Sequence, residues 1–159
     1  MSRLVRPHGS HALKPLLLEG QERAEELKRA EGLRRVPLTT RETSDLIMMA
    51  IGAFTPLDGF MGHDDWKGCC EDFTLPSRNG LFWPIPITLS AAEDLAAAIA
   101  PNEEVALWDT ETQAIVGTMR VAEKYTIDKE YECRQVFRTT EAAHPGVKKV
   151  MEQGSVNLA

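Results

Sequence analysis

Residues 52–62 read GAFTPLDGFMG, and this loop carries more structural information than any other stretch of the chain. Glycine and proline recur through it, which predicts turns and not a regular element. Gly52 and Gly59 are expected to supply backbone angles that larger residues disfavour. So many apolar side chains in one loop should be buried, either in the domain's own core or against a neighbour; they are Phe54, Pro56, Leu57, Phe60 and Met61.

Helical patterns lie on both sides of the 52–62 loop. Thr39 followed by Glu42 has the spacing of a capping box, with Thr40 as the rival N-cap, and an apolar face then runs to Ile51. After the loop, residues 63–75 look helical because large side chains recur at i, i+3, i+4 and i+7, namely Trp66, Cys69, Cys70 and Phe73. The sequence therefore predicts two helices joined by a turn-rich, apolar connection.

Further helices are expected both before and after this pair. Good helix formers fill residues 16–31, and Gly32 marks the expected stop. Ser90 followed by Glu93 has capping-box spacing and predicts a short helix over 90–100. The last two are expected over residues 128–137, with Asp128 as the N-cap, and from Pro145 to about 154.

Strand patterns are short and scattered. A hairpin is expected from residues 105–109 and 114–121, and Gly117 marks a possible bulge. The prolines of WPIPITL, residues 83–89, favour an extended edge over a central strand. The other expected strands are residues 33–38, 124–127 and 155–158. These patterns predict a mixed α+β domain with short, mostly antiparallel strands.

Composition places the chain among ordinary globular proteins. The 159 residues are 43% hydrophobic and 26% charged, which suits one domain with a short arm. No apolar run approaches the roughly 20 residues needed to cross a bilayer, and the N-terminus lacks the apolar stretch of a secretory signal. Three cysteines without CxxC spacing fit free thiols in a reducing compartment. We therefore expect a soluble, cytoplasmic protein with no membrane partner.

Charge is divided unevenly along the chain. Residues 1–41 carry nine basic and five acidic groups (9 − 5 = +4), whereas residues 42–159 carry nine and nineteen (9 − 19 = −10). One interpretation is an N-terminal arm and helix lying on an acidic body. The other is a basic surface for a polyanion such as RNA, against which the net charge of −6 argues.

The histidines and carboxylates form no recognisable active site. His8 and His11 have an HxxH spacing, but a phosphate site of that type needs a strand just before the pair and a helix just after it. His63 and His144 stand at helix starts, where capping or pairing is the simpler role. Adjacent Asp64 and Asp65 do not converge on one point and favour a solvated helix start. No nucleophile, base and orienting group occur together, so no catalytic or metal-binding residue is assigned.

Five stretches, taken together, resemble the ATP sulfurylase (sulfate adenylyltransferase) family. The 52–62 loop resembles its Gly-x-Phe-(Ser/Thr)-Pro-Leu-x-Gly-Phe-Met signature. In the same order and spacing as in that family, the chain also has PHG at residues 7–9, FWPIPITL at 82–89, EKY at 123–125 and TTEAAHPGV at 139–147.

The resemblance covers the family's N-terminal domain, which is PUA-like, a small mixed domain with a β-barrel core. It implies an arm over residues 1–15, a PUA-like domain over 16–159 and a catalytic α/β domain beyond residue 159. The last residues, 156–159, look like the start of an element, which also suggests further chain. The family's catalytic Gln-x-Arg-Asn-Pro motif does not occur here. His8 and His11 correspond to the N-terminal PHG region, so no catalytic, substrate-binding or metal residue is carried over.

The resemblance also implies what the complete enzyme does. ATP and sulfate would give adenylyl sulfate and pyrophosphate, or the reverse reaction would make ATP. Mg²⁺ would accompany ATP in the catalytic domain, and this chain itself would hold no cofactor. Its expected partners are that catalytic domain and further copies of the enzyme, commonly in a dimer.

The role of this domain stays open between two interpretations. Its 52–62 loop either packs near the catalytic domain and helps to orient it, or only closes the domain's own core. The residues concerned are Gly52, Phe54, Pro56, Leu57, Gly59 and Phe60. The alternative functions are a PUA-like RNA-binding module, which the acidic composition disfavours, and an oligomerisation module.

Overall fold

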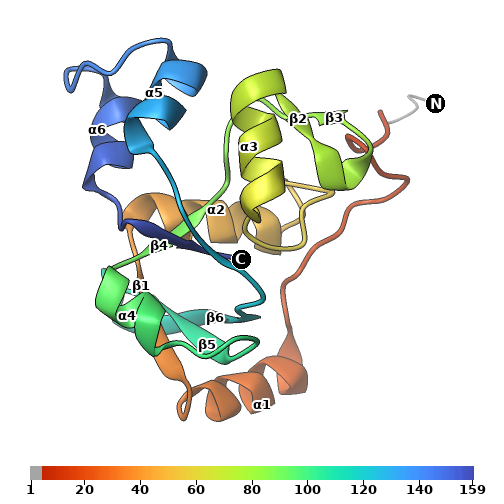
Figure 1. The fold of residues 1–159 in the computed structure, drawn as a ribbon. Helices are drawn as coiled ribbons and strands as arrows, with labels where there is room; N and C mark the ends of the chain where they lie inside the picture. Colours follow the sequence, from red (N-terminus) through yellow and green to blue (C-terminus); the bar gives the residue numbers. More distant parts are fainter. Residues whose placement is uncertain (1–4) are drawn as a thin grey trace.

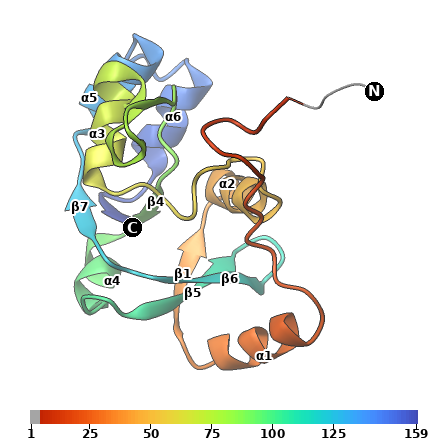
Figure 2. The same ribbon diagram turned by 90° about the vertical axis from the view of Figure 1, so that its right-hand side faces the viewer.

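The computed structural model describes residues 5–159, so the first four residues of the expected arm lie outside the described part. Figures 1 and 2 show three helices, α3 (His63–Asp72), α5 (Lys129–Phe137) and α6 (Pro145–Glu152), gathered at one end. The opposite end holds a sheet with helix α1 (Gly20–Ala30) beside it. Helix α2 (Thr40–Ala50) lies between the two ends.

The strands within residues 5–159 form three small sheets. In the first, β1 (Arg34–Leu38) runs parallel to β5 (Glu104–Asp109), which pairs antiparallel with β6 (Ala114–Arg120). In the second, β8 (Val156–Leu158) lies between β4 (Leu89–Ala91) and β7 (Lys124–Thr126), antiparallel to both. The third pairs β2 (Thr74–Leu75) with β3 (Leu81–Phe82), on either side of the short helix η1 (Pro76–Arg78). The mixed α+β class is confirmed, but within residues 5–159 no sheet closes into the β-barrel that the resemblance implied.

Several expected helix starts are confirmed by their capping groups. Thr39 and Glu42 form both hydrogen bonds of a capping box at the start of α2. Asp128 accepts a hydrogen bond from the Tyr131 N–H at the start of α5. Pro145 stands in the first turn of α6, and the His144 side chain accepts from the N–H groups of Gly146 and Val147.

The predicted starts of two helices were wrong, because the backbone there is hydrogen-bonded to distant residues. Helix α1 begins at Gly20 and not at Leu16, because the N–H groups of Leu16 and Leu17 both donate to the Ala50 carbonyl at the end of α2. Ser90 is not an N-cap: it lies in strand β4, and α4 (Glu93–Ala98) begins after Ala92 without a side-chain cap. Pairing with β8 therefore overrides the local capping signal.

Two further boundaries also moved. Helix α3 ends at Asp72 because Phe73 adopts a left-handed backbone conformation, and the expected last residues form β2. The hairpin does have an irregularity beside Gly117: Leu107 pairs with Gly117 and Trp108 with Ile115. Val116 is thus the extra residue of the bulge.

One main hydrophobic cluster joins the sheets to α2, α3 and α4, and a smaller one forms around Trp66, Cys70 and Tyr125. A third fills the space between α5 and α6 with Cys133, Val147 and Val150. Within residues 5–159, no helix is both long enough and apolar enough to cross a bilayer.

The basic N-terminal segment lies against acidic groups of the first sheet. Arg29 of α1 is 2.6 Å from Glu104, and Arg34 is 2.9 Å from Glu103. Arg29 also pairs with Glu26 within its own helix. These contacts support the interpretation of a basic helix on an acidic body, because the same guanidinium groups are already paired.

Candidate functional site

The 52–62 loop joins the end of α2 to the start of α3. Hydrogen bonds within the loop and to the N-terminal arm hold its backbone. Gly52 has a φ of 79°, and a Cβ there would stand 3.1 Å from the backbone nitrogen of Pro15. The Thr55 hydroxyl donates to the Gly52 carbonyl at 2.7 Å and accepts from the Lys14 N–H at 2.9 Å. The Thr55–Pro56 peptide bond is cis. The prediction that Gly52 supplies an angle unsuited to larger residues is confirmed.

The apolar side chains of the loop enter the domain's own core. Leu57, Phe60 and Met61 are all buried in the main cluster. Pro56 is buried too. Phe54 is half-buried and packs its edge on the Trp83 ring, with 5.9 Å between centroids. These residues therefore close the core, and a contact with a catalytic domain stays a prediction.

Gly59 differs from the expectation. Its φ is outside the left-handed region, and a Cβ built on it would meet nothing within 4 Å. The domain's own structure therefore does not require glycine at this position. Beside it, exposed Asp58 forms an ion pair with Arg78 at 2.8 Å, which ties this part of the loop to η1.

The structure links the loop, directly or through residue 82, to three of the other four stretches. The Met61 N–H donates to the Ile87 carbonyl at 2.9 Å, and the Tyr125 hydroxyl donates to the Met61 carbonyl at 2.7 Å. The His8 ring nitrogen Nε2 lies 2.7 Å from the Phe82 carbonyl oxygen. The fifth stretch, residues 139–147, lies apart from the loop and starts α6.

The potential nucleophiles are unsuited to chemistry. All three cysteines are free and buried, as expected. Burial raises the pKa of the Cys69 thiol to about 12 and raises the pKa of Cys70 as well, which keeps both protonated. Burial likewise raises the pKa of Tyr125. Within the described residues, no group of His, Cys, Asp or Glu side chains is arranged to hold a metal ion.

The HxxH pair lacks the setting that a phosphate site needs. His8 and His11 are both exposed and lie in an irregular segment. Residues 5–7 form no strand, and the next helix begins only at Gly20. The other two histidines have structural surroundings: His144 caps α6, and His63 stacks near Trp66 and Tyr125 at the start of α3.

Two buried carboxyl groups were missed as organising residues. Glu42 was expected only as a capping residue, but its second oxygen also accepts from the N–H and hydroxyl of Ser90, at 2.7 and 2.8 Å. Glu132 accepts from the Trp66 indole at 2.7 Å and is 2% exposed. Burial raises the pKa of Glu132. The helical pattern around Glu132 gives no signal of burial, because its partner is 66 residues away.

The geometry defines a small α+β domain whose sequence motifs serve mainly to lock loops, sheets and helix ends together. The family model of the PUA-like domain matches residues 5–159. The chain belongs to the PUA-like domain family.

Named relatives extend this comparison. The chain is 62% identical over its whole length to a sulfate adenylyltransferase of Syntrophobacter fumaroxidans, of which it covers 39%. It is 56% identical to the sulfate adenylyltransferase of Thiobacillus denitrificans and 57% identical to that of Chlorobaculum tepidum. These matches include 100% and 98% of this chain, respectively, and 38% of each relative. It thus spans about two-fifths of the length of these relatives.

A solved structure shares the fold. The hexameric APS kinase from Thiobacillus denitrificans matches 78% of this chain with a TM-score of 0.65 and 30% identity. The match covers 24% of that protein's chain.

Proposed function

We propose that this chain is the non-catalytic PUA-like part of a sulfate adenylyltransferase. The observation that carries the proposal is its 62% identity, over its full length, to part of an enzyme of that name. The site geometry supports it, because the apolar residues of the 52–62 loop close the domain's own core. The complete enzyme would form adenylyl sulfate and pyrophosphate from ATP and sulfate, or run in reverse.

In this proposal the substrates and the cofactor belong to the catalytic part. ATP with Mg²⁺, sulfate, adenylyl sulfate and pyrophosphate would bind there, because transfer of an adenylyl group needs cations around the phosphates. The enzyme would work in the cytoplasm, where three free cysteines stay reduced. The contribution of this chain would be structural.

The test is ATP formation from adenylyl sulfate and pyrophosphate. We expect no activity above background from the 159-residue chain and clear activity from the complete enzyme. Activity that stays with this chain through purification would contradict the non-catalytic role, and a His8→Ala, His11→Ala double variant would then locate the missed group.

Gly59 gives a clean test of the contact between the 52–62 loop and the catalytic part. Because a Cβ at Gly59 meets nothing within the domain, Gly59→Leu should leave the melting temperature of this chain unchanged. In the complete enzyme, bulk at a packed contact should lower both turnover and thermal stability. The matched control is Gly32→Leu, which adds the same bulk at an exposed position just after α1. Unchanged turnover in Gly59→Leu would leave the loop as a core-closing turn alone.

An oligomerisation role is the second candidate, favoured by one apolar surface. Leu16, Leu17 and Leu18 are exposed, and the first two are hydrogen-bonded to the end of α2, which exposes Ile47 and Ile51. Contiguous exposed apolar side chains of this kind mark contact surfaces. Light scattering would decide: a dimer of the isolated chain that Ile47→Glu dissociates would support it, and a monomer at high concentration would argue against it.

A further inference from the structure

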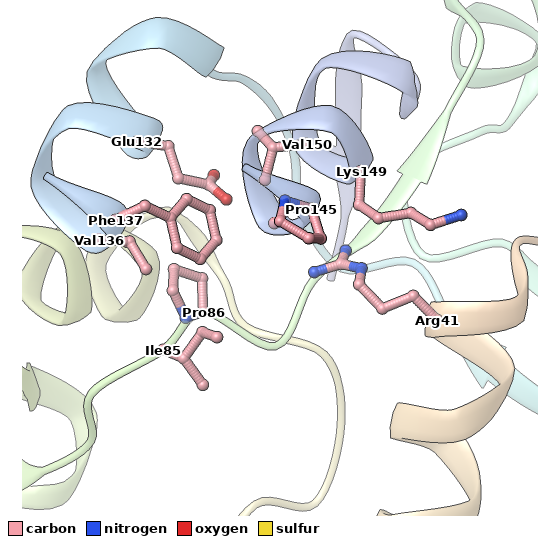
Figure 3. Close-up of a pocket in the computed structure, with 10 residues that line it drawn as sticks. Arg41, Ile85, Pro86, Glu132, Val136, Phe137, Pro145, Lys149 and Val150 are labelled. Atoms are coloured by element: carbon pink, nitrogen blue, oxygen red, sulfur yellow. The ribbon is translucent and has the colours of Figure 1, made fainter. Parts of the chain in front are cut away.

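A cavity of about 240 Å³ lies between α5, α6 and the segment before β4, away from the 52–62 loop. Figure 3 shows its walls, which come from four separate parts of the chain. Two of the five motif stretches meet here: FWPIPITL supplies Ile85 and Pro86, and TTEAAHPGV supplies Pro145 and Gly146. The cavity is therefore built by the fold and not by a single element.

The middle of the cavity is apolar. Phe137 turns its ring toward Pro86 and Ile85, and Val150 and Pro145 stand opposite on α6 (Figure 3). Flat apolar walls with one aromatic ring suit a planar, ring-shaped ligand. A ring held this way would be fixed in orientation only by polar groups at the ends of the cavity.

One end is formed by Glu132. Its Oε2 accepts from the Trp66 indole N–H, whereas Oε1 accepts no hydrogen bond from the described residues. The side chain points into the cavity between α5 and α6 (Figure 3). Although the residue as a whole is 2% exposed, Oε1 is not among the buried polar atoms without a partner, so it is accessible from the cavity. It can therefore accept a hydrogen bond from an N–H group of a ligand.

The other end is cationic. The Arg41 guanidinium is held through one nitrogen by the Thr88 carbonyl at 3.3 Å and by Gln153 Oε1 at 3.2 Å, which fixes its position. Lys149 of α6 is exposed near it, and its side chain extends away from the Arg41 guanidinium (Figure 3). Both line an adjoining hollow of about 60 Å³, to which Glu152 also contributes a carboxylate. An anionic group there would meet two cations, with the Glu152 carboxylate opposing it and the Asp45 and Glu132 carboxyls also interacting with Arg41.

We propose that this cavity binds a small aromatic amine that carries an anionic group. The amine would donate to Glu132 Oε1, the ring would lie against Phe137 and Pro86, and the anion would meet Arg41 and Lys149. The chemistry is shared by free aminoaryl acids and by adenine nucleotides, which differ in the distance between amine and anion. The proposal does not depend on the transferase function of the complete protein.

Trp66 supplies the reporter for the test. Its indole N–H donates to Glu132, so a ligand that donates to the same carboxyl will shift its proton–nitrogen NMR signal. We would titrate the labelled chain with 4-aminobenzoate and, separately, with adenosine monophosphate, each to millimolar concentration. A saturable shift at Trp66, without one at Trp108 beneath Arg35, is expected for at least one probe. Benzoate and aniline, which each lack one polar end, should bind more weakly.

Matched variants test each end separately. Lys149→Ala should weaken binding of the responding probe about fivefold, while Lys148→Ala, at an equally exposed position on the same helix, should not. Glu132→Gln should weaken it further, with Glu130→Gln as the control on α5. Should Glu132→Gln fail to fold, the lysine pair still decides. The proposal is overturned if neither probe moves the Trp66 signal, or if Lys149→Ala and Lys148→Ala bind equally.

Discussion

At the scale of single residues, buried polar side chains hold the structure in register. Glu42 is fully buried, and four donors converge on its two oxygens: the N–H and hydroxyl groups of Thr39 and of Ser90. One side chain therefore fixes the start of α2 and joins it to β4, 48 residues further on. A buried polar cluster of this kind is stable only while each of its donors has an acceptor.

Glu42→Gln should be strongly destabilising although it keeps the shape of the side chain. The amide nitrogen cannot accept, so one pair of donors faces another donor inside the core. We expect the free energy of unfolding to fall by about 3 kcal/mol, measured by urea denaturation of the chain. Glu31→Gln, at an exposed position, should change it by less than about 0.5 kcal/mol. Equal effects of the two variants would contradict this role of Glu42.

Asp45 makes stability depend on pH. Burial raises the pKa of Asp45 from its ordinary value of 3.8 to about 6, against a smaller opposing effect of Arg41. The folded state therefore holds this proton more tightly than the unfolded state does. Its contribution to stability is full below pH 3.8 and is lost as the pH rises through about 6.

Asp45→Asn should remove that loss. The free energy of unfolding of the variant, relative to that of the natural chain, should rise between pH 4 and pH 6. Chemical denaturation at each pH measures this difference. Asp72→Asn, at an exposed position, should leave the slope unchanged. Parallel pH profiles for the natural chain and Asp45→Asn would show that the folded environment does not perturb this carboxyl.

At the scale of elements, short strands depend on close backbone contact. Strand β8 is the central strand of its sheet, although it has three residues and lies at the end of the sequence. Its approach to β4 is made possible by Gly154, because a Cβ there would overlap the backbone carbonyl group of Ala91. The Gly154 N–H also donates to the Ser90 hydroxyl at 3.1 Å.

Gly154→Ala should push β8 away from β4. The clash is with backbone, which cannot rotate aside, so we expect a loss of about 3 kcal/mol in the free energy of unfolding. Amide exchange at Val156 and Leu158 should quicken first, because their pairing to β4 and β7 is weakened. Gly59→Ala is the matched control, with open space around the new methyl group. A fully stable Gly154→Ala chain would rule out this close approach.

At the scale of the whole molecule, the N-terminal arm connects distant parts of the fold. Its backbone passes the 52–62 loop, where Lys14 donates to Thr55, and then the end of α2. His8 reaches the carbonyl of Phe82, and a Cβ at Gly9 would overlap the Leu81 side chain. The arm is thus part of the domain's packing, although its sequence suggested an irregular extension.

Thr55→Val should loosen the arm where it crosses the 52–62 loop. The change keeps the shape of the side chain but removes the hydroxyl that accepts from Lys14 and donates to Gly52. We expect a loss of about 1–2 kcal/mol and faster hydrogen exchange at the Lys14 amide. Exchange at Leu16 and Leu17, bonded to Ala50, should change less. Thr140→Val at an exposed site is the control, and unchanged exchange at Lys14 would contradict the anchoring role.

The sequence alone determined the family, and it determined the local structure wherever a strong chemical signal lies within a few residues. Capping side chains such as Thr39 and Asp128 mark helix starts because they bond to N–H groups within the same few residues. Periodic apolar residues likewise predicted α2 and α3, although the predicted end of α3 was three residues too late. The ordered motifs indicated the PUA-like domain that the comparison confirmed.

Only the tertiary structure decided where local signals gave way to distant partners. Ser90 became a strand residue because Glu42 and β8 bind it, and Leu16 stayed outside α1 because its amide is bonded to Ala50. The open space at Gly59 and the cavity lined by Glu132 also depend on which segments of the chain pack against one another. Such contacts join residues tens of positions apart, so no short window of sequence contains their energy.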